Sequence, residues 1–90
     1  MERLHAIVHG DVQGVGFRYF ILRRGEALRL RGWVRNNDDG TVELLAEGGR
    51  PELEQLKLAA ESGPTLARVE RVDARWSAAG GGLSPFELTG

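Results

Sequence analysis

The residues best suited to chemistry lie in one glycine-rich stretch near the N-terminus, Gly10-Asp11-Val12-Gln13-Gly14-Val15-Gly16-Phe17-Arg18. The stretch joins a strand-like run, residues 4–9, to a helix-like run, residues 17–30. Glycines let the backbone turn tightly and approach a ligand closely, and a helix N-terminus presents unpaired N–H groups with a partial positive charge. Arg18 adds a guanidinium that can bind two oxygens of one anion. The stretch is therefore typical of a site for a phosphate-sized anion.

This loop differs from the common nucleotide-binding loop in the residues that follow its last glycine. The nucleotide-binding motif needs a Lys and then a Ser or Thr, which reach the outer phosphates and hold Mg²⁺. Phe17 and Arg18 stand in that place here, which indicates a site for one phosphoryl group without a metal. On glycine spacing alone, a tight strand-to-helix turn that carries a surface arginine is a slightly better explanation.

A second stretch, Gly32 to Glu43, has the pattern of a strand, a turn and a strand. The two stretches together resemble the acylphosphatase family. The first is similar to the family's G-x-V-Q-G-V-x-F-R signature and the second to its G-W-V-x-N-x-x-x-G-x-V-E signature, in the same order and with one helix between them. Two matches of this length rarely coincide by chance, and the resemblance extends over almost the whole chain.

The resemblance implies the hydrolysis of an acyl phosphate to a carboxylate and inorganic phosphate, with no metal and no cofactor. It assigns the family's phosphate-binding arginine to Arg18 and its water-positioning asparagine to Asn36. The phosphate-binding N–H groups would come from the glycine-rich loop and the start of the helix, which are residues Val12, Gln13, Gly14, Val15, Gly16 and Phe17. Two positions depart from the usual family pattern, with an acidic Asp11 where a basic or neutral residue is common and Asn37 where Ser or Thr is common.

The alternation of side chains between the two faces of a strand provides an independent test of whether Arg18 and Asn36 belong to one site. Val34 is expected to face the helices, and Asn36 then points to the same side, because alternate residues of a strand share a face. The glycine-rich loop lies on that side too, so we expect Arg18 and Asn36 to meet at one site. Considered alone, an asparagine before a hairpin turn usually caps the turn by bonding to nearby backbone.

The order of the predicted elements indicates an α+β, ferredoxin-like two-layer sandwich, βαββαβ, with a mostly antiparallel sheet and both helices on one face. After the first strand and helix come strands over residues 31–36 and 41–47, a helix over 51–62 and a strand over 68–76. In this last strand Val69 and Val72 have opposite parity, so a bulge or a twist is expected near Glu70-Arg71. A short extra edge strand is predicted over residues 84–88. The 90 residues form one domain, residues 1–90.

Composition narrows the class of partner. Twelve basic residues stand against 13 acidic ones, for a net charge of -1, which argues against a nucleic-acid binder. No apolar run is long enough to span a membrane, and no signal-peptide pattern is present. The chain has no cysteine. We therefore expect a cytoplasmic monomer whose partner is a small molecule.

Other residues that could suggest chemistry have simpler explanations. His5 and His9 have a spacing that can bind a metal, but no third ligand is in view, and Asp38-Asp39 before Gly40 is an ordinary turn.

Two alternatives to the enzyme remain. The first is a non-catalytic domain of the same fold that binds phosphate or carbamoyl phosphate, because larger carbamoyl-transfer maturation proteins begin with a similar domain. The second is an RNA-binding sheet, which ranks last because aromatic residues and basic charge are few.

Overall fold

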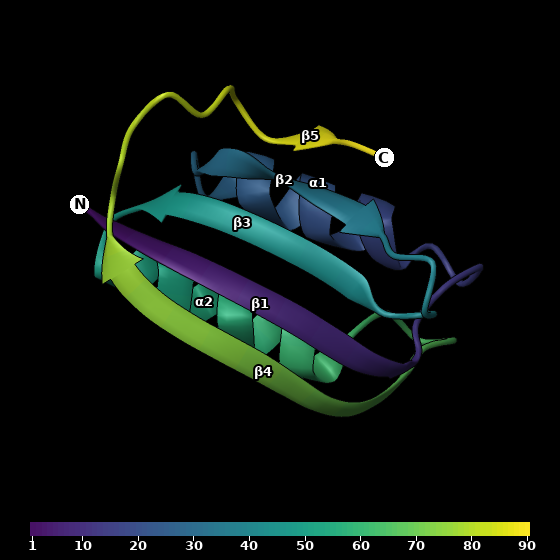
Figure 1. Ribbon diagram of the computed structural model, residues 1–90. Coiled ribbons are helices and arrows are strands. Elements are labelled where there is room, and N and C mark those ends of the chain that lie inside the picture. Colours follow the sequence, from purple (N-terminus) through teal and green to yellow (C-terminus); the bar gives the residue numbers. More distant parts are fainter.

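The computed structural model describes all of residues 1–90. Its elements follow the chain in the order β1 (Glu2–Asp11), α1 (Phe17–Ala27), β2 (Arg31–Asn36), β3 (Val42–Gly48), α2 (Arg50–Ser62), β4 (Arg68–Ala78) and β5 (Glu87–Leu88). The strands form one sheet in the order β4-β1-β3-β2-β5, in which only the pairing of β2 with β5 is parallel. Both helices cover the same face of the sheet (Figure 1). The predicted ferredoxin-like sandwich is confirmed.

The core lies between the sheet and the two helices. Leu4, Ala6 and Val8 of β1 are fully buried, and the helices contribute buried residues such as Ile21 and Leu56. These side chains alternate along the strand and recur at helical spacing along the helices, as a two-layer sandwich requires. Alternate residues of β2 therefore face the helices, and the residues between them face the open side of the sheet.

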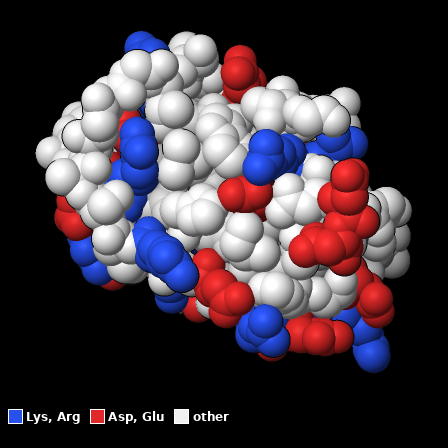
Figure 2. All heavy atoms as spheres, viewed as in Figure 1, with Lys and Arg blue, Asp and Glu red and all other residues white.

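The face of the sheet that the helices leave open carries charges of both signs. Figure 2 shows Lys and Arg interspersed with Asp and Glu over this side of the molecule, without a continuous basic patch. Several of these residues are paired across strands, for example Arg3 with Glu47 and Arg35 with Glu43. Neither helix has the length and hydropathy needed to cross a bilayer.

Helix α1 ends at Ala27, three residues before the predicted end at Leu30. Arg29 adopts a left-handed backbone conformation, with φ 57°, and its N–H bonds to the carbonyl of Glu26 while the N–H of Leu30 bonds to that of Gly25. This pair of bonds closes the helix in a Schellman motif. The prediction was wrong here because Leu30 is buried like a helix residue, although its backbone already leads into β2.

A β-bulge lies where β1 turns into the glycine-rich loop. His9 pairs with Arg71 and Gly10 pairs with Val69, so Glu70 has no partner on β1. Of the bulge or twist predicted near Glu70-Arg71, the structure shows the bulge. Gly10 has φ 133°, and a Cβ there would lie 2.0 Å from the carbonyl oxygen of Arg68, which excludes any other residue. The bulge and the glycine together direct the chain out of the sheet toward α1.

The C-terminal strand is shorter than predicted. β5 comprises Glu87 and Leu88, and only an isolated bridge at Pro85 continues it toward the predicted start at residue 84. The ring of Phe86 packs against α1 at Gly25, where a Cβ would lie 2.6 Å from the ring. The remaining predicted elements agree with the structure to within two residues at each end.

Candidate active site

A cavity of about 170 Å³ opens where β1 ends, α1 begins and β2 ends. Its walls are formed by Val12, Gly14, Gly16, Phe17, Arg18, Tyr19 and Asn36. The structure therefore places Arg18 and Asn36 on one cavity, although they come from different elements. The parity argument is consistent with this arrangement, because Val34 is fully buried on the helix side of β2.

The backbone around the cavity offers unpaired hydrogen-bond donors. None of the N–H groups of residues 13–19 donates to another group of the chain. Gly14 and Gly16 have φ of 75° and 78°, a conformation that glycine adopts at little cost. Gly16 is the N-cap of α1 and makes no capping bond through a side chain, and the first turn holds no acidic residue. The donors and the helix dipole therefore make this end of α1 attractive to an anion.

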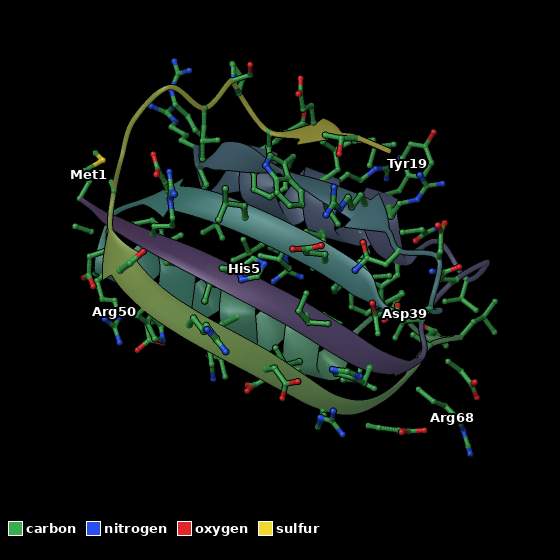
Figure 3. All side chains as sticks on the ribbon, in the orientation of Figure 1. Met1, His5, Tyr19, Asp39, Arg50 and Arg68 are labelled. Carbon is green, nitrogen blue, oxygen red and sulfur yellow. The ribbon has the colours of Figure 1, made fainter.

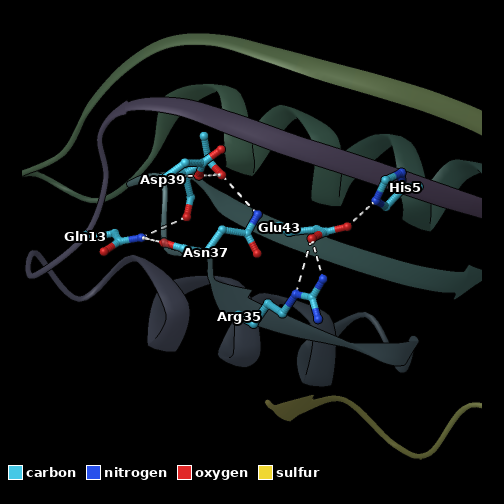
Figure 4. A network of polar contacts seen from close by, with 7 residues as sticks. His5, Gln13, Arg35, Asn37, Asp39 and Glu43 are labelled. Carbon is cyan, nitrogen blue, oxygen red and sulfur yellow. Dashed lines mark hydrogen bonds and ion pairs between the residues drawn. The ribbon is translucent and has the colours of Figure 1, made fainter. Parts of the chain in front are cut away.

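Two residues of the glycine-rich loop, Gln13 and Val15, do not line the cavity. The Gln13 side-chain amide donates to the carbonyl oxygens of Asn37 and Thr41, at 2.7 and 2.9 Å, and thereby ties the loop to the turn between β2 and β3 (Figure 4). Val15 packs against the hydrophobic core. These two side chains hold the loop in place, and only their backbone N–H groups belong to the set of unpaired donors.

Arg18 is half-buried and makes no ion pair. Arg3, Arg35 and Arg50 each pair with a carboxylate within 2.9 Å, whereas neither the neighbouring Asp11 nor any other acidic group lies within ion-pair distance of Arg18. A guanidinium has five N–H donors in a planar fork that fits two oxygens of a phosphoryl group. Arg18 therefore contributes a positive charge to the cavity that no group of the chain neutralises.

Asn36 has a side-chain oxygen, Oδ1, that is buried and has no hydrogen-bond partner. Buried polar atoms are nearly always bonded, so each exception calls for an explanation. Leaving such an acceptor unpaired costs roughly 1–3 kcal/mol. Asn36 lies on the wall of the cavity, but solvent does not reach Oδ1 in this conformation, so a ligand or a water molecule there would bond to it only after the side chain turns.

The hairpin turn after Asn36 is capped by other residues. Asp39 Oδ1 accepts bonds from the Thr41 hydroxyl and the Thr41 N–H, at 2.6 and 3.0 Å, and Asn37 Nδ2 donates to the same hydroxyl (Figure 4). The hydroxyl bond is the main reason that the pKa of Asp39 is below its ordinary value. Turn capping therefore does not explain the side chain of Asn36, and Asp39 is a turn residue.

Tyr19 lines the cavity but was not among the predicted site residues. It follows Arg18 in the first turn of α1, and 58% of its surface is exposed. Figure 3 shows Tyr19 at the end of the molecule where Asp39 lies, opposite Met1. Its position next to Arg18 was the only signal in the sequence, because a tyrosine at the start of a helix matches no catalytic pattern.

The two histidines lie on the open face of the sheet, away from this cavity. His5 contacts Glu43 at 2.6 Å and His9 contacts Asp73 at 2.9 Å. Burial raises the pKa of Glu43, but hydrogen bonds from His5 and Arg35 outweigh burial, and the net pKa is lowered. The chain contains no group of three or more His, Cys, Asp or Glu residues placed to hold a metal.

Comparison with known proteins places this chain in a family. The family model described as Acylphosphatase matches residues 4–88. An acylphosphatase of Salinibacter ruber is 48% identical over 97% of this chain and 92% of its own length, and one of Thermococcus kodakarensis is 46% identical over 98% and 96%. The crystal structure of acylphosphatase from Bacillus subtilis superimposes with a TM-score of 0.95 at 38% identity, over 99% of both chains.

The chain belongs to the acylphosphatase family, and it is an enzyme of the class that hydrolyses acyl phosphates. A further similarity is to a much larger protein. A structure of full-length HypF in a phosphate- and nucleotide-bound form matches with a TM-score of 0.87 at 26% identity, and the match covers 100% of this chain but 12% of HypF.

Proposed function

We propose that the cavity is the active site for acyl phosphate hydrolysis without a metal, in which Arg18 and the glycine-rich loop hold the phosphoryl group and Asn36 orients the attacking water. The observation that carries this proposal is that Asn36, with its buried and unpartnered Oδ1, lines the same cavity as Arg18, which has no ion-pair partner. One group is a free acceptor and the other a free cation. Water and a phosphoryl group are the two species that such a pair would hold next to each other.

The phosphoryl oxygens bind to the unpaired N–H groups of residues 13–19 and to the guanidinium of Arg18. Phosphoryl transfer depends mainly on positioning and on stabilising charge at the oxygens. Donors that are already oriented in the free protein need no reorganisation as the charge shifts, so they favour the transition state. The loop and Arg18 thereby supply the electrostatic part of catalysis.

Asn36 supplies the positioning part. Its Oδ1 accepts a hydrogen bond from the water and so directs a lone pair of the water oxygen toward phosphorus. No carboxylate or imidazole lines the cavity to act as a base, and the proton of the water passes to the substrate phosphate. A carboxylate, whose conjugate acid has a pKa of about 4, leaves without a general acid. The sparse set of side chains is therefore sufficient for this reaction.

The hydrolysis of benzoyl phosphate, followed by ultraviolet absorbance with EDTA present, tests the proposal. An aryl phosphate monoester, whose leaving group is far more basic, serves as the negative substrate. We expect turnover of the acyl phosphate that EDTA does not affect, and no turnover of the monoester. Activity that disappears with EDTA and returns with a divalent metal would overturn the mechanism.

The alternative is a domain that binds phosphate or carbamoyl phosphate without hydrolysing it. This alternative rests on the similarity to HypF, a much longer chain that contains a domain of this fold and whose structure is of a phosphate- and nucleotide-bound form. Calorimetric titration with inorganic phosphate separates the two functions. Binding of phosphate by a folded protein that does not hydrolyse benzoyl phosphate would support the binding domain.

A further inference from the structure

The walls of the cavity include only one large side chain that a substrate could contact outside the phosphate site. Val12 and Phe17 are about 1% exposed and belong to the core, whereas Tyr19 is 58% exposed. Gly14 and Gly16 present backbone, and Arg18 and Asn36 present polar groups. The hydroxyl of Tyr19 makes no hydrogen bond within the chain, so its ring is not held in place by an intramolecular partner.

The size of the cavity indicates that part of the substrate lies beyond it. A volume of about 170 Å³ is below the range of about 300–1,000 Å³ that is usual for small-molecule pockets. A phosphoryl group bound by the N–H groups of the loop leaves little room for anything larger than a short acyl chain. The rest of a larger acyl group must extend along the rim, where the ring of Tyr19 is the accessible apolar surface.

We infer that the ring of Tyr19 is the subsite for the acyl group and gives the enzyme a preference for acyl phosphates with an aromatic or bulky apolar acyl group over acetyl phosphate. This inference rests on the proposed function. Aromatic rings attract one another through offset or edge-to-face packing in addition to burying apolar area. Acetyl phosphate, with a single methyl group, gains little from this surface, so the contact discriminates between substrates by size.

The test compares kcat/KM for benzoyl phosphate and acetyl phosphate in the wild type, Tyr19→Ala and Tyr19→Phe, with the inhibition constant of inorganic phosphate as a further measurement. We expect Tyr19→Ala to lower the ratio of the two kcat/KM values roughly tenfold, as the loss of an aromatic contact predicts. The inhibition constant of phosphate should stay unchanged. Tyr19→Phe should keep the wild-type ratio, because the ring is retained.

Leu58→Ala provides the matched control, since Leu58 is 65% exposed on α2 and does not line the cavity. This variant should keep the wild-type ratio. An unchanged ratio in Tyr19→Ala, or an equal loss for both substrates, would overturn the subsite. A loss for both substrates in Tyr19→Phe would point to the hydroxyl instead of the ring. Hydrolysis of acetyl phosphate by the wild type separates a failure of the subsite from a failure of the proposed function, in which neither substrate would react.

Discussion

The two helices begin in the same way and then differ in chemistry. Each follows a strand of the sheet, each has a glycine as its N-cap, Gly16 in α1 and Gly49 in α2, and neither glycine offers a capping side chain. In α2 a proline, which has no N–H, occupies the first turn, and Glu52 places a negative charge beside the helix dipole. In α1 the first turn has neither feature, and its N–H groups face a cavity.

The arginine in each first turn shows the same contrast. Arg50 of α2 pairs with Glu2 and Glu54, at 2.8 and 3.5 Å, and its guanidinium lies 3.6 Å from the ring centre of Trp76. Arg18 of α1 has no such partner. The N-terminus of α2 is thus neutralised by the chain itself, whereas no acidic group of the chain neutralises that of α1. An unsatisfied helix end in a folded protein is therefore a useful indicator of a site.

The largest effect that this contrast predicts comes from exchanging each arginine for alanine. Arg18→Ala should lower kcat/KM for benzoyl phosphate by about 10³-fold, by analogy with the loss of an arginine that stabilises a phosphoryl transition state, with little change in Tm. Arg50→Ala should leave kcat/KM unchanged and lower Tm, because it removes two ion pairs and an aromatic contact. Steady-state kinetics and thermal unfolding measure the two effects. Equal activity in the two variants would contradict the proposed difference between the N-termini of α1 and α2.

The next largest effect concerns Asn36, which has the only buried side-chain polar atom without a partner. Asn36→Ala should lower kcat roughly 10²-fold, the lower end of the effect of removing one positioned group from a transition state. The inhibition constant of inorganic phosphate should hardly change, because the proposed mechanism assigns Asn36 to the attacking water and Arg18 to the phosphate. A variant that loses phosphate binding and kcat to the same degree would show that Asn36 holds the phosphoryl group.

The N-cap glycines predict an effect on stability. Gly16→Ala places a Cβ at φ 78° and should lower the free energy of unfolding by roughly 1–2 kcal/mol, with a loss of activity as the loop shifts. Gly49 has φ -71°, so Gly49→Ala needs no unusual backbone conformation, and its Cβ would displace only the flexible carboxylate of Glu52. It should therefore cost less stability than Gly16→Ala and keep full activity. Denaturant unfolding gives both values. Similar losses of stability in the two variants would contradict the conformational argument.

The third residue of each helix can be changed so that the electrostatics of the two N-termini become more similar. One substitution adds a negative charge to α1 and the other removes one from α2. Tyr19→Glu places a carboxylate where α2 has Glu52 and should stabilise α1 by about 0.3–1 kcal/mol through the helix dipole. It should also weaken phosphate inhibition, because the new charge repels the anion. Glu52→Gln should lower stability by a similar amount without affecting inhibition. Stronger phosphate binding by Tyr19→Glu would be incompatible with an anion site at this helix end.

The smallest effect is the pH dependence of stability, which comes from carboxylates outside the active site. The Gly80 N–H is the main reason that the pKa of Glu47 is lowered, and Arg3 and the Gly81 N–H add to the shift. A lowered pKa in the folded state gives stability that is fully present above the ordinary Glu value of about 4.3 and is lost as the pH falls through the lowered pKa.

Unfolding measured as a function of pH should therefore show a decline in acid that is smaller in Glu47→Gln than in the wild type. Glu26→Gln, which removes an exposed carboxylate of α1 that makes no ion pair, is the matched control for the loss of one negative charge. An identical acid decline in Glu47→Gln and the wild type would show that this carboxylate does not contribute.

The sequence by itself determined the elements and the two motifs. Alternation along the strands placed Val34 in the core, and glycines identified the loop before α1. The opposite parity of Val69 and Val72 along their strand indicated a bulge or a twist near Glu70. These features are local, because backbone conformation and side-chain period depend on residues a few positions apart. Arg18 and Asn36 could be named at this stage because they lie within motifs that resemble those of a family.

Only the tertiary structure decided which polar groups remain unpaired. Arg18 lacks a carboxylate partner, Asn36 Oδ1 lacks a donor, and Tyr19 stands at the rim of their cavity, and none of this follows from spacing along the chain. The sequence also did not indicate that α1 ends at Ala27, because the residue in the left-handed conformation after the helix is Arg29 and not a glycine. Whether a polar group is satisfied depends on contacts between elements distant in sequence, and those contacts exist only once the sheet and helices have packed.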